Sequence, residues 1–305
     1  MQKKIRRFSV RSRIYIRPRI AKHKKLQKFT ISSYRTFCSL TGFLHVLPDF
    51  YILGAEKCGT TSLFDYLTEH PSGFYPISKE PRFFGKYYKR GLNWYRTGFP
   101  FKLQKFYANS INQKKFITGE STVRYLDNPH IPLRIKNVTP NANFIIMIRN
   151  PVDRAYSQYN MMLYDGVEKL SFEDALDKEE ERTSEHFEKM KNDENYYSDD
   201  YFYFGYKHRG LYLDKIQTWM KYFPKEKFRI IKSEDFFSDP HKVFQNTLEF
   251  LNLPNYNLEN YTTRGKIEYK QPSMLPETRK KLIDYFKPHN EKLSKFLNLE
   301  LKWDK

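Results

Sequence analysis

Short apolar runs alternate along this chain with longer segments whose apolar residues recur every three or four positions. The runs at 50–54, 115–119, 143–148 and 227–232 are rich in Ile and Phe, as is typical of buried strands. Helices are predicted at 60–69, 151–164, near 240–251 and near 276–287. Strands that alternate with helices form a mainly parallel sheet with helices on both faces, so the pattern predicts an α/β fold. Such folds bind ligands at the carboxyl ends of their strands.

The chain is long enough for one domain of this kind with a substantial core. It has 305 residues, of which 39% are hydrophobic, and the 24 Tyr and 26 Phe argue for folded structure rather than disorder. The segment 165–200 is densely charged. We predict a solvated helix or a mobile flap there rather than a functional site.

Positive charge is concentrated at the start of the chain. Residues 1–47 contain 13 Lys and Arg and no Asp or Glu, so the remainder is only mildly basic although the formal net charge is +19. We therefore predict a flexible basic tail over 1–47 and a single domain over 48–305. The tail has two interpretations, which are contact with an anionic polymer or membrane surface and a solubilising arm.

Targeting and redox signals are weak in this sequence. No apolar run approaches the roughly 20 residues that span a bilayer. The best candidate, 37–47, is short, interrupted by polar residues and without a small-residue cleavage site, which predicts a cytoplasmic enzyme. With only Cys38 and Cys58 present, a structural disulfide is not expected, and Cys58 is interpreted as an inert residue.

The most informative segment follows the first predicted strand. Gly54 and Gly59 bound a tight turn that leads into a helix whose first turn is Thr60, Thr61 and Ser62. Backbone N–H groups of such a turn and helix start form a cradle for a phosphate-like anion. The spacing nearly satisfies the triphosphate loop G-x-x-x-x-G-K-[ST], but Thr60 occupies the lysine position and Lys57 lies inside the loop.

A second cation site is predicted at the end of strand 143–148. Arg149 stands where triphosphate-using enzymes place a metal-binding acid, and Asn150 and Pro151 suit the start of the next helix. Ser157 lies two turns further on. The arrangement predicts a P-loop-like domain without a metal, whose ligand carries two separate anionic groups.

These motifs resemble those of the sulfotransferases that use 3′-phosphoadenosine 5′-phosphosulfate (PAPS). Residues 57–62 look like their loop for the 5′-phosphosulfate, and Arg149 with Ser157 looks like their 3′-phosphate clamp. Further segments are similar to the heparan sulfate sulfotransferases, namely 79–84 (KEPRFF), 91–95 (GLNWY), 99–100 (FP), 119–125 (GESTVRY), 263–266 (TRGK) and 285–293. The resemblance extends from about residue 49 to residue 303.

The resemblance implies PAPS as the sulfuryl donor and an in-line transfer. Lys57 is expected to stabilise the leaving phosphate, and Glu120, in the segment 119–125, is the expected general base. The donor-binding residues are then Lys57, Cys58, Gly59, Thr60, Thr61, Ser62, Arg149, Ser157, Arg264, Gly265 and Lys266.

The acceptor implied by the resemblance is the hydroxyl or amine of a carbohydrate, either a heparan-like polysaccharide or another glycan. Residues expected to meet it are Lys79, Arg82, Trp94, Arg124 and His208, of which His208 is also the rival base. No specific nucleic-acid partner and no transmembrane segment are expected. The animal relatives implied by the resemblance would be Golgi membrane proteins, and their disulfide-closed loop has no counterpart here.

Two alternatives remain at this level. A P-loop kinase or other triphosphate-using enzyme would explain the loop and the parallel sheet, although Thr60 and Arg149 argue against it. A non-catalytic binder of anionic polymers would explain the tail but would leave the loop unused.

Overall fold

The computed structural model describes residues 38–111, 115–264 and 274–303. Its centre is a sheet of five strands in the order β2-β3-β1-β4-β5, and every pairing in it is parallel. The strands are β1 (Phe50–Gly54), β2 (Gly73–Phe74), β3 (Ile117–Glu120), β4 (Asn143–Ile148) and β5 (Phe228–Lys232). The predicted α/β fold with a mainly parallel sheet is confirmed.

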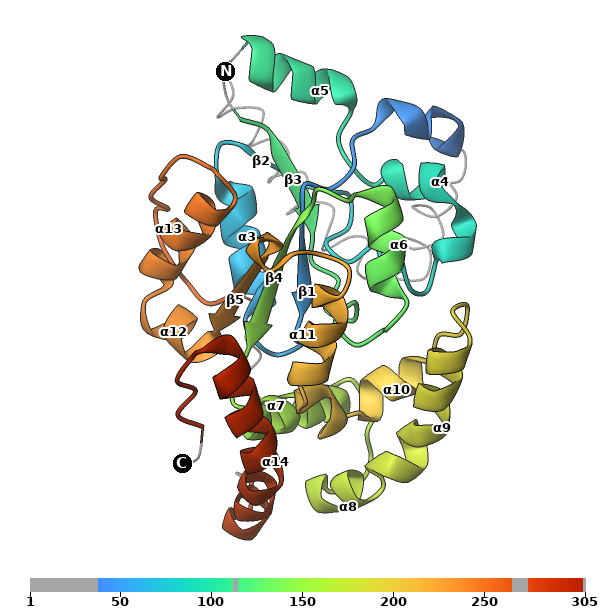
Figure 1. The fold of residues 1–305 in the computed structure, drawn as a ribbon, viewed down its shortest axis with the longest axis vertical. Helices are drawn as coiled ribbons and strands as arrows, with labels where there is room; N and C mark the ends of the chain where they lie inside the picture. The colour runs from blue at the N-terminus through green and yellow to red at the C-terminus, as the bar shows by residue number, and fades with distance from the viewer. Residues whose placement is uncertain (1–37, 112–114, 265–273, 304–305) are drawn as a thin grey trace.

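Helices cover both faces of the sheet and its carboxyl end (Figure 1). One face carries α3 (Thr60–Glu69), α12 (Ser233–Ser238) and α13 (Pro240–Phe250), and the other carries α6 (Ile131–Val138) and α11 (Leu213–Met220). Beyond the carboxyl ends of the strands lie α7 (Pro151–Tyr164), α8 (Phe172–Asp177), α9 (Glu179–Asn192), α10 (Asp199–Phe204) and α14 (Pro276–Leu297). Two short 3₁₀ helices connect these elements, η5 (His208–Gly210) and η6 (Lys225–Lys227).

The two central strands form the middle of the core. All of β1 and all but the first residue of β4 are buried, which agrees with their continuous apolar runs. Their register pairs Ile52 with Ile145, so both strands contribute apolar side chains at the same level. Because these strands are buried on both faces, the loops that leave their carboxyl ends are held on a rigid base.

The largest differences between predicted and observed boundaries are in α14 and β3. Helix α14 continues to Leu297 and passes through Pro288, where the sequence predicted an end near 287. Its second half buries Asn290 and Leu293, and this packing outweighs the hydrogen bond that a proline removes. Strand β3 begins at Ile117 and includes Glu120, whereas the sequence placed it at 115–119.

The charged segment 165–200 forms α8, α9 and the start of α10. Helix α9 exposes most of its length and buries only Glu179, Thr183 and Met190, which fits the predicted solvated helix. Glu179 accepts hydrogen bonds from the backbone N–H groups of Lys207 and His208, at 2.7 and 2.8 Å. These bonds tie the segment to η5.

Four short elements gather at the amino end of the strands, at the top of Figure 1. They are η2 (Cys38–Leu44), α4 (Leu92–Arg96), α5 (Lys102–Phe106) and the π-helical turn η4 (Tyr107–Ile111); the 3₁₀ helix η3 (Tyr88–Arg90) precedes α4. The backbone N–H of Val46 donates to the Pro100 carbonyl at 3.0 Å, and Val46 is buried. Residues 1–37 of the basic tail lie outside the described residues.

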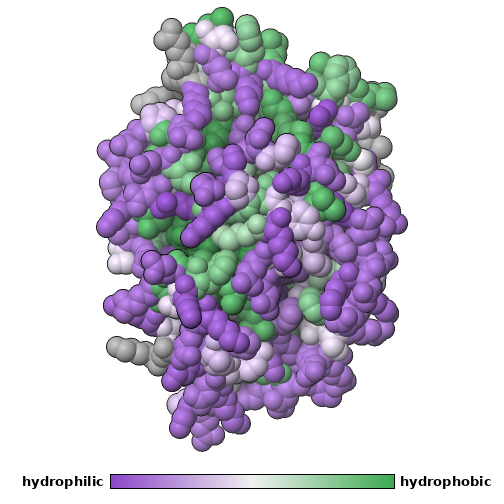
Figure 2. Space-filling view, viewed as in Figure 1, coloured by the Kyte–Doolittle hydropathy of each residue, from purple (hydrophilic) through white to green (hydrophobic). Residues whose placement is uncertain are grey.

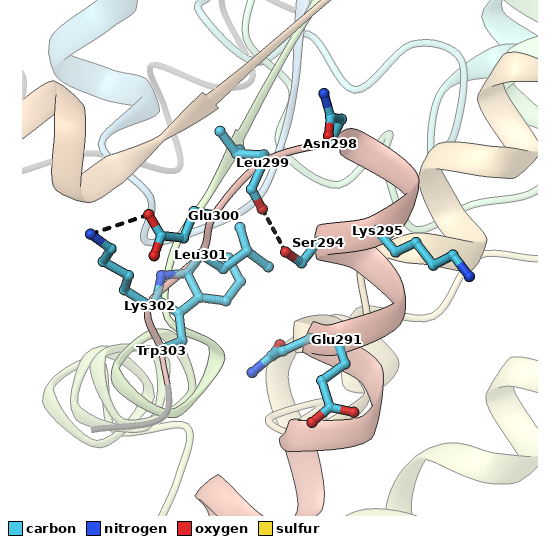
Figure 3. Close-up of a pocket in the computed structure, with 10 residues that line it drawn as sticks. Glu291, Ser294, Lys295, Asn298, Leu299, Glu300, Leu301, Lys302 and Trp303 are labelled. Carbon is cyan, nitrogen blue, oxygen red and sulfur yellow. Dashed lines mark hydrogen bonds and ion pairs between the residues drawn. The ribbon is translucent and has the colours of Figure 1, made fainter.

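The segment after α14 and the last two turns of that helix line an open hollow of about 650 Å³ (Figure 3). Ser294 donates to the Leu299 carbonyl at 2.7 Å, and Lys302 pairs with Glu300 at 3.2 Å. None of the site residues that the sequence predicts among the described part of the chain lines this hollow.

Candidate active site

The loop between β1 and α3 leaves the first turn of α3 open. Gly59 precedes the helix with φ of 88°, and a Cβ there would lie 2.9 Å from the ring of Phe237, so glycine is required. No side chain within the described ranges caps the start of α3 by a hydrogen bond. The N–H groups of this turn are therefore available to an anion.

The loop backbone is held from below by two donors. Arg149 Nη1 donates to the Lys57 carbonyl at 3.2 Å, and Ser233 Oγ donates to the Cys58 carbonyl at 2.7 Å. Lys57 itself has φ of 70°, an uncommon conformation for a residue with a side chain. Since the carbonyl and the N–H of one peptide point in opposite directions, these contacts direct the next N–H groups away from the two donors.

Three cationic side chains lie around this loop. Lys57 Nζ is 3.7 Å from Met161 Sδ of α7, and Arg149 follows β4 directly. The third is Lys79, whose ammonium donates to Thr61 Oγ1 at 2.7 Å. Burial lowers the pKa of Lys57 and that of Lys79, because removing an ammonium group from water disfavours its charged form. Holding both groups charged in this partly buried place therefore has a free-energy cost. An anion bound there would offset that cost.

Ser157 lies on the face of α7 that is directed toward the β1–α3 loop. It lies one helical turn before Met161 in α7, and residues four apart share a helix face. Because Met161 contacts Lys57, Ser157 lies on the side of α7 that faces the loop. Asn150 accepts from the Val152 N–H at 3.0 Å, which fixes the start of this helix directly after Arg149.

Ser62 connects α3 to the segment near the predicted last nucleotide loop. The N–H of Arg264 donates to Ser62 Oγ at 2.8 Å, and this hydroxyl lies 3.3 Å from the Arg264 carbonyl. The Arg264 guanidinium pairs with Glu69 at 2.6 Å. Gly265 and Lys266 lie outside the described residues, but the chain that leads to them is fixed at the start of α3.

Cys58 is inaccessible in the loop. Its side chain is fully buried, and burial raises the pKa of the thiol to about 11 although Arg154 and Arg149 oppose the shift. A thiol of this kind stays protonated at neutral pH and is a poor nucleophile. The interpretation of Cys58 as an inert residue agrees with this environment.

Glu120 ends β3 in a closed environment. Its side chain is fully buried, with Thr122 donating to Oε2 at 2.6 Å and Tyr95 donating to Oε1. Burial raises the pKa of Glu120 to about 7, while the bonds from Thr122 and Tyr95 act in the opposite direction. Such a pKa suits a general base, but both carboxylate oxygens are occupied by protein donors.

A second carboxylate, Glu80, is linked to the start of α3 through Lys79 and was not singled out from the sequence. Its side chain is 27% exposed and stands between Lys79, at 4.0 Å, and Arg82, at 3.6 Å. Lys79 in turn bonds Thr61 in the first turn of α3. The available signal was the position of Glu80 inside the KEPRFF segment, where Pro81 favours an extended backbone at the preceding residue.

The end of β3 supports the segment that carries Glu80. The Ser121 N–H donates to the Lys79 carbonyl at 2.9 Å, and the Arg82 N–H donates to Thr122 Oγ1 at 3.4 Å. Thr122 is the same residue that bonds Glu120. The buried carboxylate therefore stabilises the strand end on which the Glu80 segment rests.

A buried charge network anchors the loop from the other side. Arg209 of η5 bonds the carboxylate of Glu56 in the loop and, through Nε at 3.0 Å, that of Asp127. Lys215 of α11 also reaches Asp127, at 2.6 Å. Burial acts to raise the pKa of Asp127, but Lys215 and Arg209 outweigh it and lower this pKa to about 2. Sequence spacing offered no signal for this network, because its members are far apart in the chain.

Three of the residues predicted to contact the acceptor bond or pack against other parts of the protein instead. Arg124 donates to Tyr197 at 2.9 Å and pairs with Asp199 at 2.7 Å. Trp94 is 5% exposed, with the Arg90 guanidinium 4.9 Å from its ring centroid. The His208 ring packs against Phe187, and burial lowers the pKa of His208 to about 3, so it stays neutral. Of the other two residues in this predicted group, Lys79 bonds Thr61 at the start of α3, and Arg82 pairs with Glu80.

Comparison with known proteins agrees with this geometry. The family model described as "Sulfotransferase domain" matches residues 47–271. The chain belongs to the sulfotransferase family. It is 28% identical to the membrane-associated sulfotransferase kil1 of Dictyostelium discoideum, over 92% of this chain and 71% of that protein. It is also 28% identical to heparan sulfate glucosamine 3-O-sulfotransferase 5 of Homo sapiens, over 84% of this chain and 74% of that protein.

A solved structure supports the fold independently. The crystal structure of a sulfotransferase from Alicyclobacillus acidocaldarius superposes with a TM-score of 0.61 at 29% identity, covering 85% of this chain and all of that one. The predicted resemblance is thus confirmed. The protein is a sulfotransferase, and the alternative of a triphosphate-using kinase is not supported.

The buried carboxylate predicts a pH effect on stability in this sulfotransferase. Glu120 titrates at a pKa of about 7 when folded and near its ordinary 4.5 when unfolded, so the folded state binds more protons between these values. Wild-type stability should therefore fall as pH rises through this window. Relative to wild type, Glu120→Gln should gain about 2–3 kcal/mol in unfolding free energy between pH 5 and pH 8.

Urea unfolding of both proteins at the two pH values measures this difference. Glu291→Gln, at an exposed position of α14, is the matched control. A Glu120→Gln effect that is equal at pH 5 and pH 8 would contradict the raised pKa.

Proposed function

We propose that this sulfotransferase moves the sulfuryl group of PAPS to a hydroxyl or amine of a carbohydrate. In the proposed step the acceptor oxygen or nitrogen forms a bond to sulfur as the bond between sulfur and the 5′-phosphate oxygen breaks. The acceptor loses its proton to a protein carboxylate, and 3′-phosphoadenosine 5′-phosphate leaves with the electron pair of the broken bond. The observation that carries this proposal is the uncapped start of α3 surrounded by Lys57, Arg149 and Lys79.

The donor chemistry fits the two groups of cations. The N–H groups after Gly59 and the Lys57 ammonium suit the phosphosulfate, because charge develops on the leaving phosphate as the S–O bond breaks. Arg149, which donates to the Lys57 carbonyl, and Ser157 of α7 suit the 3′-phosphate, together with the chain that follows Arg264. Within the described ranges, no group of three or more His, Cys, Asp or Glu side chains converges to hold a metal. These side-chain cations would supply the charge that magnesium supplies in triphosphate enzymes.

A carbohydrate acceptor is supported by the named activity of a relative. A 3-O-sulfotransferase that acts on heparan sulfate glucosamine matches 84% of this chain. Near the loop, Lys79 and Arg82 supply positive charge on either side of Glu80, which suits an acceptor that already carries anionic groups. We therefore propose a heparan-like polysaccharide or another acidic glycan.

We propose Glu80 as the general base rather than Glu120, whose carboxylate is buried. A base must come within hydrogen-bond reach of the proton that it removes. Glu80 is partly exposed beside the loop, whereas the two oxygens of Glu120 accept from Thr122 and Tyr95. The assignment of Glu120 as the base stays a prediction, and its contacts suit a positioning role for the strand end beneath Glu80.

The cytoplasmic location expected from the sequence also stays a prediction. No helix among the described residues combines the length and apolar character needed to cross a bilayer. Fractionation of cells that produce the full chain would test the location.

Two cations of the proposed donor site should differ in their effect on binding and on turnover. Arg149→Ala should weaken binding of 3′-phosphoadenosine 5′-phosphate on the order of 10- to 100-fold, because it removes a charge-assisted hydrogen bond. Lys57→Ala should lower turnover by a larger factor than it lowers nucleotide affinity, since Lys57 acts mainly on the charge of the transition state. Calorimetry and initial rates measure the two quantities.

Lys178→Ala, an exposed lysine in the charged segment, is the matched control for both variants. Binding of the nucleotide should not require magnesium. Stronger binding of ATP with magnesium than of 3′-phosphoadenosine 5′-phosphate would contradict the proposed donor.

The two carboxylates give separate predictions. Glu80→Gln should lower turnover about 10²- to 10⁴-fold, the usual contribution of a general base, with nucleotide affinity retained. Glu120→Gln should lower it less than about tenfold, because the amide keeps the shape of the buried group and a bond from Tyr95. If the larger loss followed Glu120→Gln instead, the base would be Glu120.

The acceptor class is tested by supplying the full enzyme with radiolabelled donor and a panel of desulfated polysaccharides. Label should enter chains of a heparan-type backbone, and disaccharide analysis should locate it on oxygen or nitrogen. Label that enters only small phenols or peptide tyrosine would refute a carbohydrate acceptor while leaving the donor assignment intact.

A further inference from the structure

Helix α5 and the following turn η4 present apolar side chains to solvent. Leu103, Phe106, Tyr107 and Ile111 are 74%, 60%, 55% and 60% exposed. Their spacing of three and four residues places them on one side of a helix. A stripe of this kind normally faces a protein core, so its outward direction requires an explanation.

The outward direction of the stripe is fixed by contacts on the opposite side of the helix. Lys105 points inward, where its Nζ lies 3.1 Å from Asp49 Oδ1 and 5.7 Å from the Phe116 ring centroid. Ala108 is buried, and the Phe101 N–H donates to Gln104 Oε1 at 2.8 Å. The helix thus places Lys105 against the protein and its apolar face toward solvent.

The neighbouring N-terminal segment extends the same surface. Phe101 packs against the His45 ring with a centroid distance of 4.1 Å, which places η2 beside the start of α5. Figure 2 shows apolar side chains gathered at this end of the molecule, over α5 and η2. We call this surface the apolar end face; it comprises Leu40, Phe43, Leu44, Phe101, Leu103, Phe106, Tyr107 and Ile111.

The apolar end face lies at the opposite end of the sheet from the active site. Asp49, the partner of Lys105, directly precedes β1, so α5 is attached at the amino end of that strand. The anion loop leaves the carboxyl end of the same strand after Gly54. In Figure 1 the strands run away from α5 toward α7. A partner seated on the apolar end face would leave the loop open.

The positive charge of residues 1–37 restricts which kind of partner could bind the apolar end face. Residues 1–37 contain 13 Lys and Arg and no Asp or Glu, and they join η2 at its first residue. A partner must therefore offer negative charge beside an apolar layer. An anionic polysaccharide offers charge without the apolar layer, whereas a bilayer with anionic headgroups offers both.

We propose that the apolar end face docks this sulfotransferase peripherally on an anionic lipid surface. The stripe of α5 and η4 and the side chains of η2 would enter the boundary between headgroups and acyl chains. The basic residues that precede η2 would pair with the headgroups. The active-site loop would then face away from the membrane, toward a polymeric acceptor in solution.

The test uses the full chain with vesicles of phosphatidylcholine, with and without phosphatidylserine, in a co-sedimentation assay. Binding should require phosphatidylserine and should weaken as salt is raised. Phe106→Ser combined with Ile111→Ser should lower the vesicle partition coefficient at least about tenfold, because two apolar side chains lose their burial. Phe296→Ser, at an exposed site on α14, is the matched control and should change it little.

Replacement of Lys22, Lys24, Lys25 and Lys28 by Gln should also weaken binding to phosphatidylserine vesicles. Affinity for 3′-phosphoadenosine 5′-phosphate should be unchanged in every variant, which also reports that each variant is folded. Failure to bind either vesicle would overturn the proposal. So would binding that ignores the Phe106 and Ile111 substitutions, or a dimer in sedimentation that these substitutions dissociate, since a second copy would then cover the face.

Discussion

The open first turn of α3 is the constraint on which the site depends. A helix start with uncapped N–H groups is favourable only if an anion or water satisfies them, and here the loop is shaped to keep them uncovered. Gly59 supplies the left-handed turn, and Arg149 and Ser233 hold the preceding carbonyls. The position of this loop follows from β1, whose five residues are all buried between β3 and β4.

Charge in this protein is distributed between two different tasks. Around the loop, Lys57, Lys79 and Arg149 remain partly accessible and suit a ligand. Below it, Arg209 joins Glu56 of the loop to Asp127; Arg209 and Asp127 are buried, and the Glu56 side chain is 18% exposed. A paired network of this kind resists movement, because separating a pair would leave an uncompensated charge in the interior.

Glu120 and Glu80 show that the surroundings of a carboxylate determine whether it can act as a base. The sequence resemblance pointed to Glu120, and the segment containing it does end a strand at the carboxyl edge, as expected. The structure adds that the carboxylate of Glu120 points into a closed group with Tyr95 and Thr122, while Glu80 stands partly exposed beside Lys79. No pattern of residue types could distinguish these two environments, since exposure depends on which aromatic residues close over a strand end.

The sequence alone determined the fold class, the glycine turn between β1 and α3, and the position of Arg149 directly after β4. These are local properties, since a strand, a glycine turn and a helix start are written in consecutive residues, as at 50–62. The resemblance to sulfotransferases rested on the same local motifs and was confirmed by the family match. Features that depend on contacts between distant segments were decided only by the tertiary structure. They are the Arg209 network, the burial of Arg124 and Trp94, the length of α14 and the outward apolar face of α5. Each of these depends on contacts between segments that folding brings together, and spacing along one chain does not record them.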